Sequence, residues 1–200
     1  ITSSRDLRFL VPGLNFYQQG SFSQPTIRGV GTSIVGPGAD ANVAIYLDGV
    51  YQPSQNTALF EFNNIEQIQV LKGPQGTLYG RNATGGAIVV TTKAPSFEPS
   101  GSLEAGYARF DELTAKAYVT GGLTERLAGS LSVLSRSDDG YSENLVTGHE
   151  TSEASVFSAQ GKLLFDVNDQ FSMTLSGFYL EHEDNTAFSY KPTGSNFLLA

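Results

Sequence analysis

The feature that most constrains the fold is a period-two alternation of apolar and polar side chains through the second half of the chain. Successive side chains of a β-strand point to opposite faces, so this pattern predicts strands with one apolar and one polar face. Five such runs follow Ser100. We expect their apolar side chains on one side of a common sheet, namely those of Leu103, Ala105, Tyr107, Leu113, Ala115, Leu131, Val133, Leu163, Phe165, Met173 and Leu175.

The connections between these runs alternate in length. We expect a tight turn at Asp111-Glu112, short turns at 124–126 and 168–170, and a long acidic connection at 138–153. Strands of about 9 to 11 residues joined in this way are typical of a membrane-spanning barrel wall. A soluble sandwich, whose strands are usually about 5 to 6 residues long, is the alternative, and the alternation alone favours neither. Five strands leave two unpaired edges, which lipid does not tolerate, so the barrel interpretation predicts a fragment.

Composition argues against several other classes of protein. No apolar run approaches the ~20 residues that a membrane helix requires, so any membrane role would use strands. The formal net charge is −8 without a basic cluster, and we therefore expect no nucleic-acid partner. The chain has no Cys and 2 His. These numbers exclude disulfides and thiolate sites and offer no basis for a metal site, so we expect neither metal nor cofactor.

The charge is unevenly distributed along the chain. Residues 1–95 carry 6 basic and 5 acidic side chains, whereas residues 96–200 carry 6 basic and 15 acidic ones. The net charges are therefore +1 and −9. This difference predicts two unlike parts that meet near Pro95.

The first part contains shorter runs punctuated by glycine. Val43–Leu47, Asp48-Gly49 and Val50-Tyr51 predict a hairpin, because Asp-Gly tolerates the positive φ values of a type I′ turn. Residues 65–71 alternate as a half-buried strand, and residues 87–92 are β-branched enough for a buried one. The segment 72–86 between them holds five glycines and predicts tight turns, with one helical turn at Leu78-Tyr79.

The chain contains no recognisable catalytic, phosphate-binding or calcium-binding motif. The stretch GRNATGGA from Gly80 lacks the lysine and the hydroxyl residue of a phosphate-binding loop. No GxSxG motif is present, and neither His lies near a plausible Ser and carboxylate pair. Asp138-Asp139-Gly140 lacks the spacing of a calcium loop. We therefore predict that the protein is not an enzyme.

Residues 65–95 carry a resemblance to a known family and read IEQIQVLKGPQGTLYGRNATGGAIVVTTKAP. This stretch closely resembles the plug-domain signature of TonB-dependent outer-membrane receptors, and Ile27-Arg28-Gly29 and VAIYLDGVY (43–51) precede it in the family's order. The resemblance implies a mainly β fold. Residues 1–95 would form a globular α+β plug domain, truncated at its amino terminus. Residues 96–200 would supply the first five or so antiparallel strands of a large transmembrane β-barrel, truncated at its carboxyl end.

The resemblance also implies a function and a location. We expect a TonB-dependent uptake receptor of the Gram-negative outer membrane that binds a scarce, large nutrient and imports it by energy-coupled plug displacement. A ferric siderophore is the first expectation, with cobalamin, haem or a glycan as alternatives. The implied partners are TonB, the nutrient and outer-membrane lipid. The signal peptide, the TonB-contacting segment, the start of the plug and most of the barrel would lie outside this chain.

Two loops correspond to the family's apical plug loops, residues 31–42 and 52–58. Their aromatic and amide side chains suit a polar chelate. The expected ligand contacts are Tyr51, Gln52, Gln55 and Asn56, with Asp40 and Asn42 as secondary choices. The competing interpretation of each is a solvated turn residue without a ligand contact.

Basic plug residues of this family pair with acidic wall residues and seat the plug in the barrel. Arg28, Lys72 and Arg81 match the basic positions. Lys72 stands where the family usually has arginine, which replaces a bidentate clamp with a point-charge contact. Its near neighbour Glu66 is expected to pair with it locally. The expected wall partners are Glu104 and Asp166, for which solvated lumen carboxylates are the alternative.

A function from a different class is also compatible with these patterns. The chain could be a soluble or cell-surface β-rich module that binds a carbohydrate through its glycine loops. Such a module would pack the apolar faces of the five runs against a second sheet. A barrel wall would leave the same faces uncovered by protein.

Overall fold

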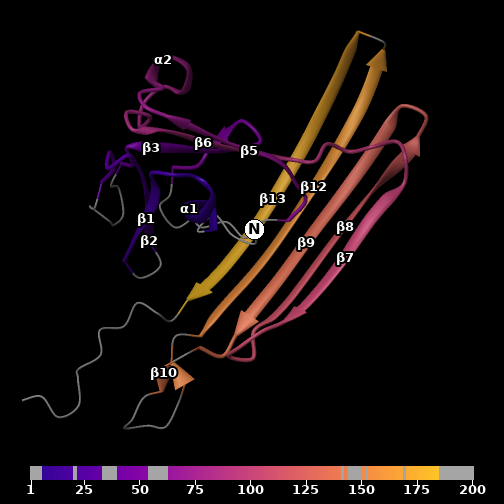
Figure 1. Cartoon of the computed structure of the whole chain (residues 1–200). Coiled ribbons are helices and arrows are strands. Elements are labelled where there is room, and N and C mark those ends of the chain that lie inside the picture. Colours follow the sequence, from indigo (N-terminus) through magenta and orange to yellow (C-terminus); the bar gives the residue numbers. More distant parts are fainter. Residues whose placement is uncertain are drawn as a thin grey trace, which may run out of the picture.

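The computed structural model shows a folded amino-terminal unit lying against one face of a long, five-stranded sheet (Figure 1). We call residues 6–92 the amino-terminal unit and the five-stranded sheet the wall. Neither of the described helices is long and apolar enough to cross a membrane. The structure describes residues 6–19, 22–32, 40–53, 63–140, 142–143, 150–151, 153–168 and 170–184.

The amino-terminal unit is built on a four-stranded sheet of order β4-β3-β6-β5, in which β3 and β6 are parallel. A separate hairpin, β1-β2, and a short helix, α1, pack beside it. The elements are α1 (Leu7–Leu10), β1 (Leu14–Gln19), β2 (Phe22–Ile27), β3 (Val43–Leu47), β4 (Val50–Tyr51), β5 (Ile65–Lys72), α2 (Gly76–Tyr79) and β6 (Gly86–Thr92). Their core consists of Leu7, Leu14, Ile27, Val43, Ile45, Leu47, Ile88 and Val90.

Four sequence predictions for this unit are confirmed. The β3-β4 hairpin turns at Asp48 and Gly49, whose φ angles of 49° and 80° are those of a type I′ turn. The strand predicted at 65–71 is β5, and the β-branched run is β6, of which five of seven residues are buried. The helical turn predicted at Leu78-Tyr79 is the end of α2.

One glycine of the glycine-rich segment has a packing reason as well as a conformational one. Gly86 begins β6 with a φ of 147°, and a Cβ built there would lie 2.2 Å from the carbonyl oxygen of Leu71 on β5. A side chain cannot be accommodated because the clashing atom belongs to the backbone of the neighbouring strand. Glycine at this position therefore allows β5 and β6 to pair.

The wall is an antiparallel sheet in which sequence order and spatial order coincide, β7-β8-β9-β12-β13. Its strands are β7 (Ser100–Tyr107), β8 (Leu113–Thr124), β9 (Leu127–Asp138), β12 (Ala154–Asn168) and β13 (Phe171–Asp184). A small hairpin, β10 (Ser142–Glu143) with β11 (Glu150–Thr151), lies in the long connection between β9 and β12. The five strands predicted after Ser100 are confirmed.

The register places all eleven predicted apolar side chains on one face of the wall. Directly paired residues share a face, and the pairs Leu103-Ala117, Ala117-Val133 and Leu163-Leu175 link the strands in this way. This face is open: Leu103 is 83% exposed and Leu175 is 64% exposed. Among the described residues no second sheet covers it, which excludes the sandwich interpretation (Figure 1). The opposite face carries the polar positions and lies toward the amino-terminal unit.

One connection differs from its prediction. The tight turn expected at Asp111-Glu112 is a longer loop between Tyr107 and Leu113, in which the Ala108 N–H still donates to the Glu112 carbonyl at 2.9 Å. The Tyr107 hydroxyl donates to the Asp111 carboxylate, which holds this loop back against its own strand. The prediction of a two-residue turn was wrong because the paired strands β7 and β8 end at Tyr107 and Leu113. The turns at the other end of the wall are short, as predicted.

Candidate functional site

The amino-terminal unit contacts the wall through the turn between β3 and β4. Asp48 at this turn points its carboxylate toward β12 and forms an ion pair with Lys162. The distance from Lys162 Nζ to Asp48 Oδ2 is 3.0 Å. The Nε2 of Gln160, two residues away on the same face of β12, donates to Oδ2 of Asp48 at 2.9 Å. A carboxylate of the first unit is thus held by two side chains of the wall.

Thr92, the last residue of β6, closes this group. Its N–H and its hydroxyl each donate to the Asp48 carboxylate at 2.8 Å. Its carbonyl oxygen accepts a hydrogen bond from Lys162 Nζ at 3.2 Å. We call Asp48, Thr92, Gln160 and Lys162 the seat. Within the seat every polar group of Asp48 and Thr92 that faces the wall has a partner.

The seat is an electrostatic contact in a largely water-free place. The side chain of Lys162 is 7% exposed and that of Asp48 is 17% exposed. Burial by itself raises the pKa of the Asp48 carboxyl, but hydrogen bonds from Thr92 and Lys162 outweigh it, so the pKa lies below its ordinary value of 3.8. Asp48 is therefore ionised at neutral pH. A buried pair of this kind adds little net stability, yet loss of one partner is strongly destabilising.

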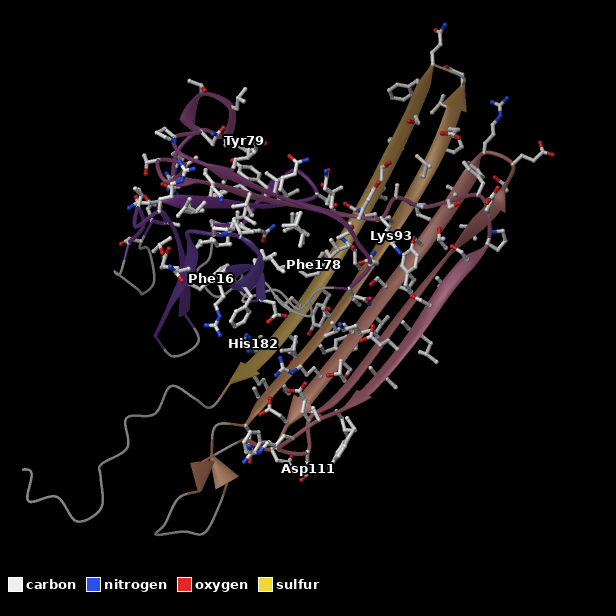
Figure 2. The ribbon with its side chains drawn as sticks, in the orientation of Figure 1. Phe16, Tyr79, Lys93, Asp111, Phe178 and His182 are labelled. Carbon is white, nitrogen blue, oxygen red and sulfur yellow. The ribbon has the colours of Figure 1, made fainter. Side chains whose placement is uncertain are left out.

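Further contacts extend the seat along the same end of the four-stranded sheet. Asn63, just before β5, donates from Nδ2 to the carbonyl oxygens of Ala117 and Val133 on two neighbouring wall strands, at 3.2 and 2.9 Å. Lys93, which follows Thr92, places its ammonium 5.5 Å from the ring centroid of Tyr118 (Figure 2). A small gap between unit and wall is lined by Leu47, Asn63, Asn64, Ile65, Val90, Thr92, Ser132, Ser158, Gln160 and Phe178.

The residues expected to seat the plug lie elsewhere. Lys72 donates from Nζ to the Pro12 carbonyl at 2.9 Å, which is a contact inside the amino-terminal unit. Arg81 forms an exposed ion pair with Asp40 at 2.8 Å, also inside the unit. The side chains of these two expected basic partners of the wall are thus bonded within their own unit.

The remaining expected seating residues are equally separate from the seat. Glu104 pairs across β7 and β8 with Lys116 at 3.8 Å, so this contact joins two wall strands. Arg28 and Glu66 are exposed and Asp166 is half-buried. None of these last three has a side-chain ion pair among the described residues. The family resemblance led us to expect basic unit residues on acidic wall residues, and the seat has the opposite polarity.

The sequence predicted the position of the wall residues of the seat but not their contact with the amino-terminal unit. Period two correctly placed Gln160 and Lys162 on the polar face of the wall. Asp48 was interpreted as a turn residue, which it is. Its second role depends on where the turn lands on the wall, 112 residues from Gln160 in sequence, and no local pattern encodes that distance.

Most of the expected ligand-contact residues are engaged in internal bonds. Asp40 accepts from Arg81 and from Asn82 Nδ2, and the same Nδ2 donates to the Tyr51 hydroxyl at 2.8 Å. Asn42 donates to the Gly31 carbonyl at 3.0 Å. The structure thus brings the side chains of Asp40 and Tyr51 together around Asn82.

The other expected ligand contacts do not join this group. Gln52 donates from Nε2 to the Val50 carbonyl at 3.2 Å. Gln55 and Asn56 lie outside the described residues. The described residues contain no group of three or more His, Cys, Asp or Glu side chains that could hold a metal ion. The chemistry that the described arrangement supports is attachment of one unit to another, through the seat.

Comparison with known proteins agrees with this architecture. A match to the family described as TonB-dependent Receptor Plug Domain covers residues 2–87. The pesticin receptor of Yersinia pestis is 35% identical over 151 residues, which cover 75% of this chain and 22% of that receptor. The iron-regulated outer membrane virulence protein of Vibrio cholerae is 27% identical over 204 residues, which cover 92% of this chain and 29% of that protein.

A solved structure shows the same arrangement of unit and wall. The crystal structure of the ferric yersiniabactin uptake receptor FyuA from Yersinia pestis superposes with a TM-score of 0.79 at 32% sequence identity. The superposition covers 88% of this chain and 28% of FyuA. The chain therefore spans less than a third of the length of each of these relatives.

Proposed function

The chain belongs to the TonB-dependent receptors, with the plug domain in its first part, and we propose that the receptor it belongs to imports a scarce, large nutrient. Its place is the outer membrane of a Gram-negative bacterium, where such receptors reside. The wall contributes the first strands of the barrel. Import would be coupled to energy supplied through TonB.

The observation that carries this proposal is the division of the wall into two unlike faces. The outward face is apolar and open, as a lipid-facing surface must be. The inward face holds the buried polar side chains Lys116, Thr120, Ser132, Gln160 and Lys162, and the amino-terminal unit lies against it (Figure 2). A sheet with lipid on one side and a plug on the other is the wall of a plugged barrel.

We propose a boundary between the two domains at Pro95, with residues 1–95 as plug and 96–200 as barrel. The last strand of the amino-terminal unit ends at Thr92 and the first wall strand begins at Ser100. Residues 93–99 between them follow the wall: the Ser96 N–H donates to the Thr120 hydroxyl at 2.8 Å, and the Phe97 carbonyl accepts from the Gly122 N–H at 3.1 Å.

The proposed nutrient is a ferric siderophore. FyuA takes up ferric yersiniabactin and is 32% identical to this chain, which supports this class of ligand above cobalamin, haem or a glycan. We propose that the apical loops 31–42 and 52–58 supply contacts to it, with Tyr51, Gln52, Gln55 and Asn56 first and Asp40 and Asn42 second. Tyr51 and Gln52 are half-buried, so each leaves part of its side chain accessible.

Import requires that ligand and TonB change the position of the plug relative to the wall. A ligand can shift such an equilibrium only through contacts that differ between the two positions. Among the described residues, the polar contacts that hold the resting position on these five strands include those of the seat, of Asn63 and of Lys93. The way in which the plug moves relative to the wall therefore depends on which of these contacts break.

The experiment is a growth test under iron limitation. The gene that encodes this chain is expressed at full length in a strain that lacks its own siderophore receptors, with and without a working TonB. The panel is ferric yersiniabactin, ferric enterobactin and ferripyoverdine, since relatives of the same fold bind or take up these chelates. We expect TonB-dependent growth on at least one chelate, and none when the strain carries an empty vector.

Two results would contradict the proposal. Growth on a chelate that does not depend on TonB would remove the energy coupling. Growth on none of the three chelates, from a receptor that reaches the outer membrane, would refute the siderophore class. In that case cobalamin and haem are tested in the same strain.

A further inference from the structure

The seat and the covalent connection to the barrel lie at the same end of the amino-terminal unit. Asp48 directly follows β3, Thr92 ends β6, and both meet the wall there. Register pairs Leu47 with Val90 and Ile65 with Thr92, so β3, β5 and β6 all present this end to the wall. The connecting residues 93–99 leave from Thr92 and follow the wall directly to β7.

The opposite end of the same sheet is bonded only within the unit, among the residues that the structure describes. This end includes Gly86 and the glycine-rich segment with α2, and Figure 1 shows α2 far from the wall. Its ion pair, Arg81-Asp40, has side chains that are 77% and 62% exposed. Tyr46 donates from its hydroxyl to the Tyr79 carbonyl at 2.6 Å, which ties α2 to β3 rather than to a wall strand.

We propose that the seat is the hinge of plug displacement, so that this end of the amino-terminal unit stays on β12 while the opposite end moves away. The proposal rests on the proposed function, because it describes how the same receptor opens. Asp48 and Lys162 are positioning residues in it. They hold the axis about which the unit turns and do not touch the nutrient.

Burial and connectivity give the physical reason. Moving the seat off the wall would separate the Lys162 ammonium, whose side chain is 7% exposed when docked, from both of its partners among the described residues, Asp48 and Thr92. Asp48 would at the same time lose its bonds to Gln160 and Lys162. The ion pair at the opposite end, Arg81-Asp40, joins two residues of the unit, so it need not break when that end moves. The seat is therefore the last of these contacts with the described strands to open.

The first test fixes the seat chemically and measures uptake. The chain contains no cysteine, so a double variant Ile65→Cys and Ser158→Cys has only these two thiols within residues 1–200. Both residues line the gap beside the seat, one from the unit and one from β12. A reducible bifunctional thiol reagent joins them in the full-length receptor in cells. Uptake of radioactive iron is measured with the three ferric chelates of the growth panel.

We expect the uptake rate of the crosslinked receptor to match that of the same receptor after reduction. The single-cysteine variants, treated with the same reagent, control for modification without crosslinking. Loss of uptake on crosslinking that returns on reduction would overturn the hinge while leaving the proposed function intact. Absence of uptake by the unmodified wild-type receptor would instead refute the proposed function, and the hinge with it.

A second measurement does not depend on crosslinking. Ala83, at the opposite end, is 1% exposed and Ser132, beside the seat, is 4% exposed, so each offers a buried position for a single cysteine. We expect thiol labelling of Ala83→Cys to accelerate when chelate and TonB are both present, and labelling of Ser132→Cys to stay unchanged. Equal acceleration at both positions would mean that the unit leaves as a rigid body, and acceleration at Ser132→Cys alone would reverse the hinge.

Discussion

Replacement of Asp48 by asparagine removes the countercharge of Lys162 while it preserves the shape of the side chain. Asparagine still offers one oxygen to Thr92 and Gln160, so the hydrogen-bond geometry of the turn is kept in part. Among the described residues, the Lys162 ammonium then keeps the Thr92 carbonyl, at 3.2 Å, as a neutral partner and has no countercharge. Because this ammonium is 7% exposed, water cannot replace the lost carboxylate.

The expected penalty follows from what a buried, broken ion pair costs. Removing one partner of such a pair typically costs about 3 to 5 kcal/mol, and we expect the lower figure because Asp48 is 17% exposed and asparagine keeps some bonds. About 3 kcal/mol corresponds to about a hundredfold change in an equilibrium constant. The contact between unit and wall should therefore open about a hundredfold more often.

Hydrogen exchange of backbone amides measures this opening directly. The Thr92 N–H donates to the Asp48 carboxylate, and in the closed seat the wall side chains Gln160 and Lys162 cover that carboxylate. Withdrawal of the wall opens this group to water, so we expect the exchange rate of Thr92 to rise with the opening. The matched control is the double variant Asp48→Asn with Lys162→Met, which removes both charges and retains the volume of the lysine stem. Apolar replacement of a whole buried pair is often neutral, so this variant should regain most of the protection.

Two outcomes would refute this reasoning. If Asp48→Asn and the double variant lose protection equally, the hydrogen bonds of the carboxylate matter and the charge pairing does not. If neither variant changes the exchange of Thr92, the seat does not hold the unit on the wall. The peptides of β7, which β8 and β9 separate from β12 in the sheet, provide the internal reference for intact barrel strands.

Three further results are expected from the same structure. The pKa of Asp48 in the folded protein lies below its ordinary value of 3.8, so the contribution of Asp48 to attachment is complete above pH 3.8 and is lost as pH falls through the lower, folded value. Exchange of the Thr92 amide measured against pH checks this. The loss of protection at acid pH should be absent in Asp48→Asn. Gly86→Ala should destabilise the amino-terminal unit by about 1 to 3 kcal/mol in thermal or denaturant unfolding. Gly76→Ala, where a Cβ meets nothing within 4 Å, should be neutral or stabilising. Equal effects of the two variants would contradict the predicted clash between a Cβ at position 86 and the Leu71 carbonyl oxygen. Leu131→Lys on the outward face should lower barrel folding into lipid vesicles by about 2 to 4 kcal/mol, whereas Ser102→Lys on the inward face should not, and a similar loss for both would argue against the assignment of faces.

The wall could be predicted from the sequence because period two is a local property. Each strand reveals its own apolar face, and antiparallel pairing of neighbours in sequence then places all of these faces on one side. The hairpin at Asp48-Gly49 was equally local, since its type I′ turn depends on the φ preferences of two adjacent residues. The loop after Tyr107 was not, because the Tyr107-Asp111 contact and the end of the ladder set its length.

Charged residues show the limit of the same approach. Arg81, Lys72 and Glu104 were expected to join unit and wall, and the structure bonds each of them within its own part. A charge in a sequence does not specify its partner, because any opposite charge within reach satisfies it. Which charges meet is decided by how two separately folded surfaces come together.

By itself, the sequence determined that this chain makes a glycine-rich unit followed by two-faced strands, because both depend on backbone preferences and on alternation over a few residues. Only the tertiary structure decided that Asp48 and Lys162 meet, since they are far apart in sequence and are brought together by docking of the unit on the wall. The attachment is a product of that docking. Local preferences build the two parts, and the docking of their surfaces brings the two charges of this ion pair together.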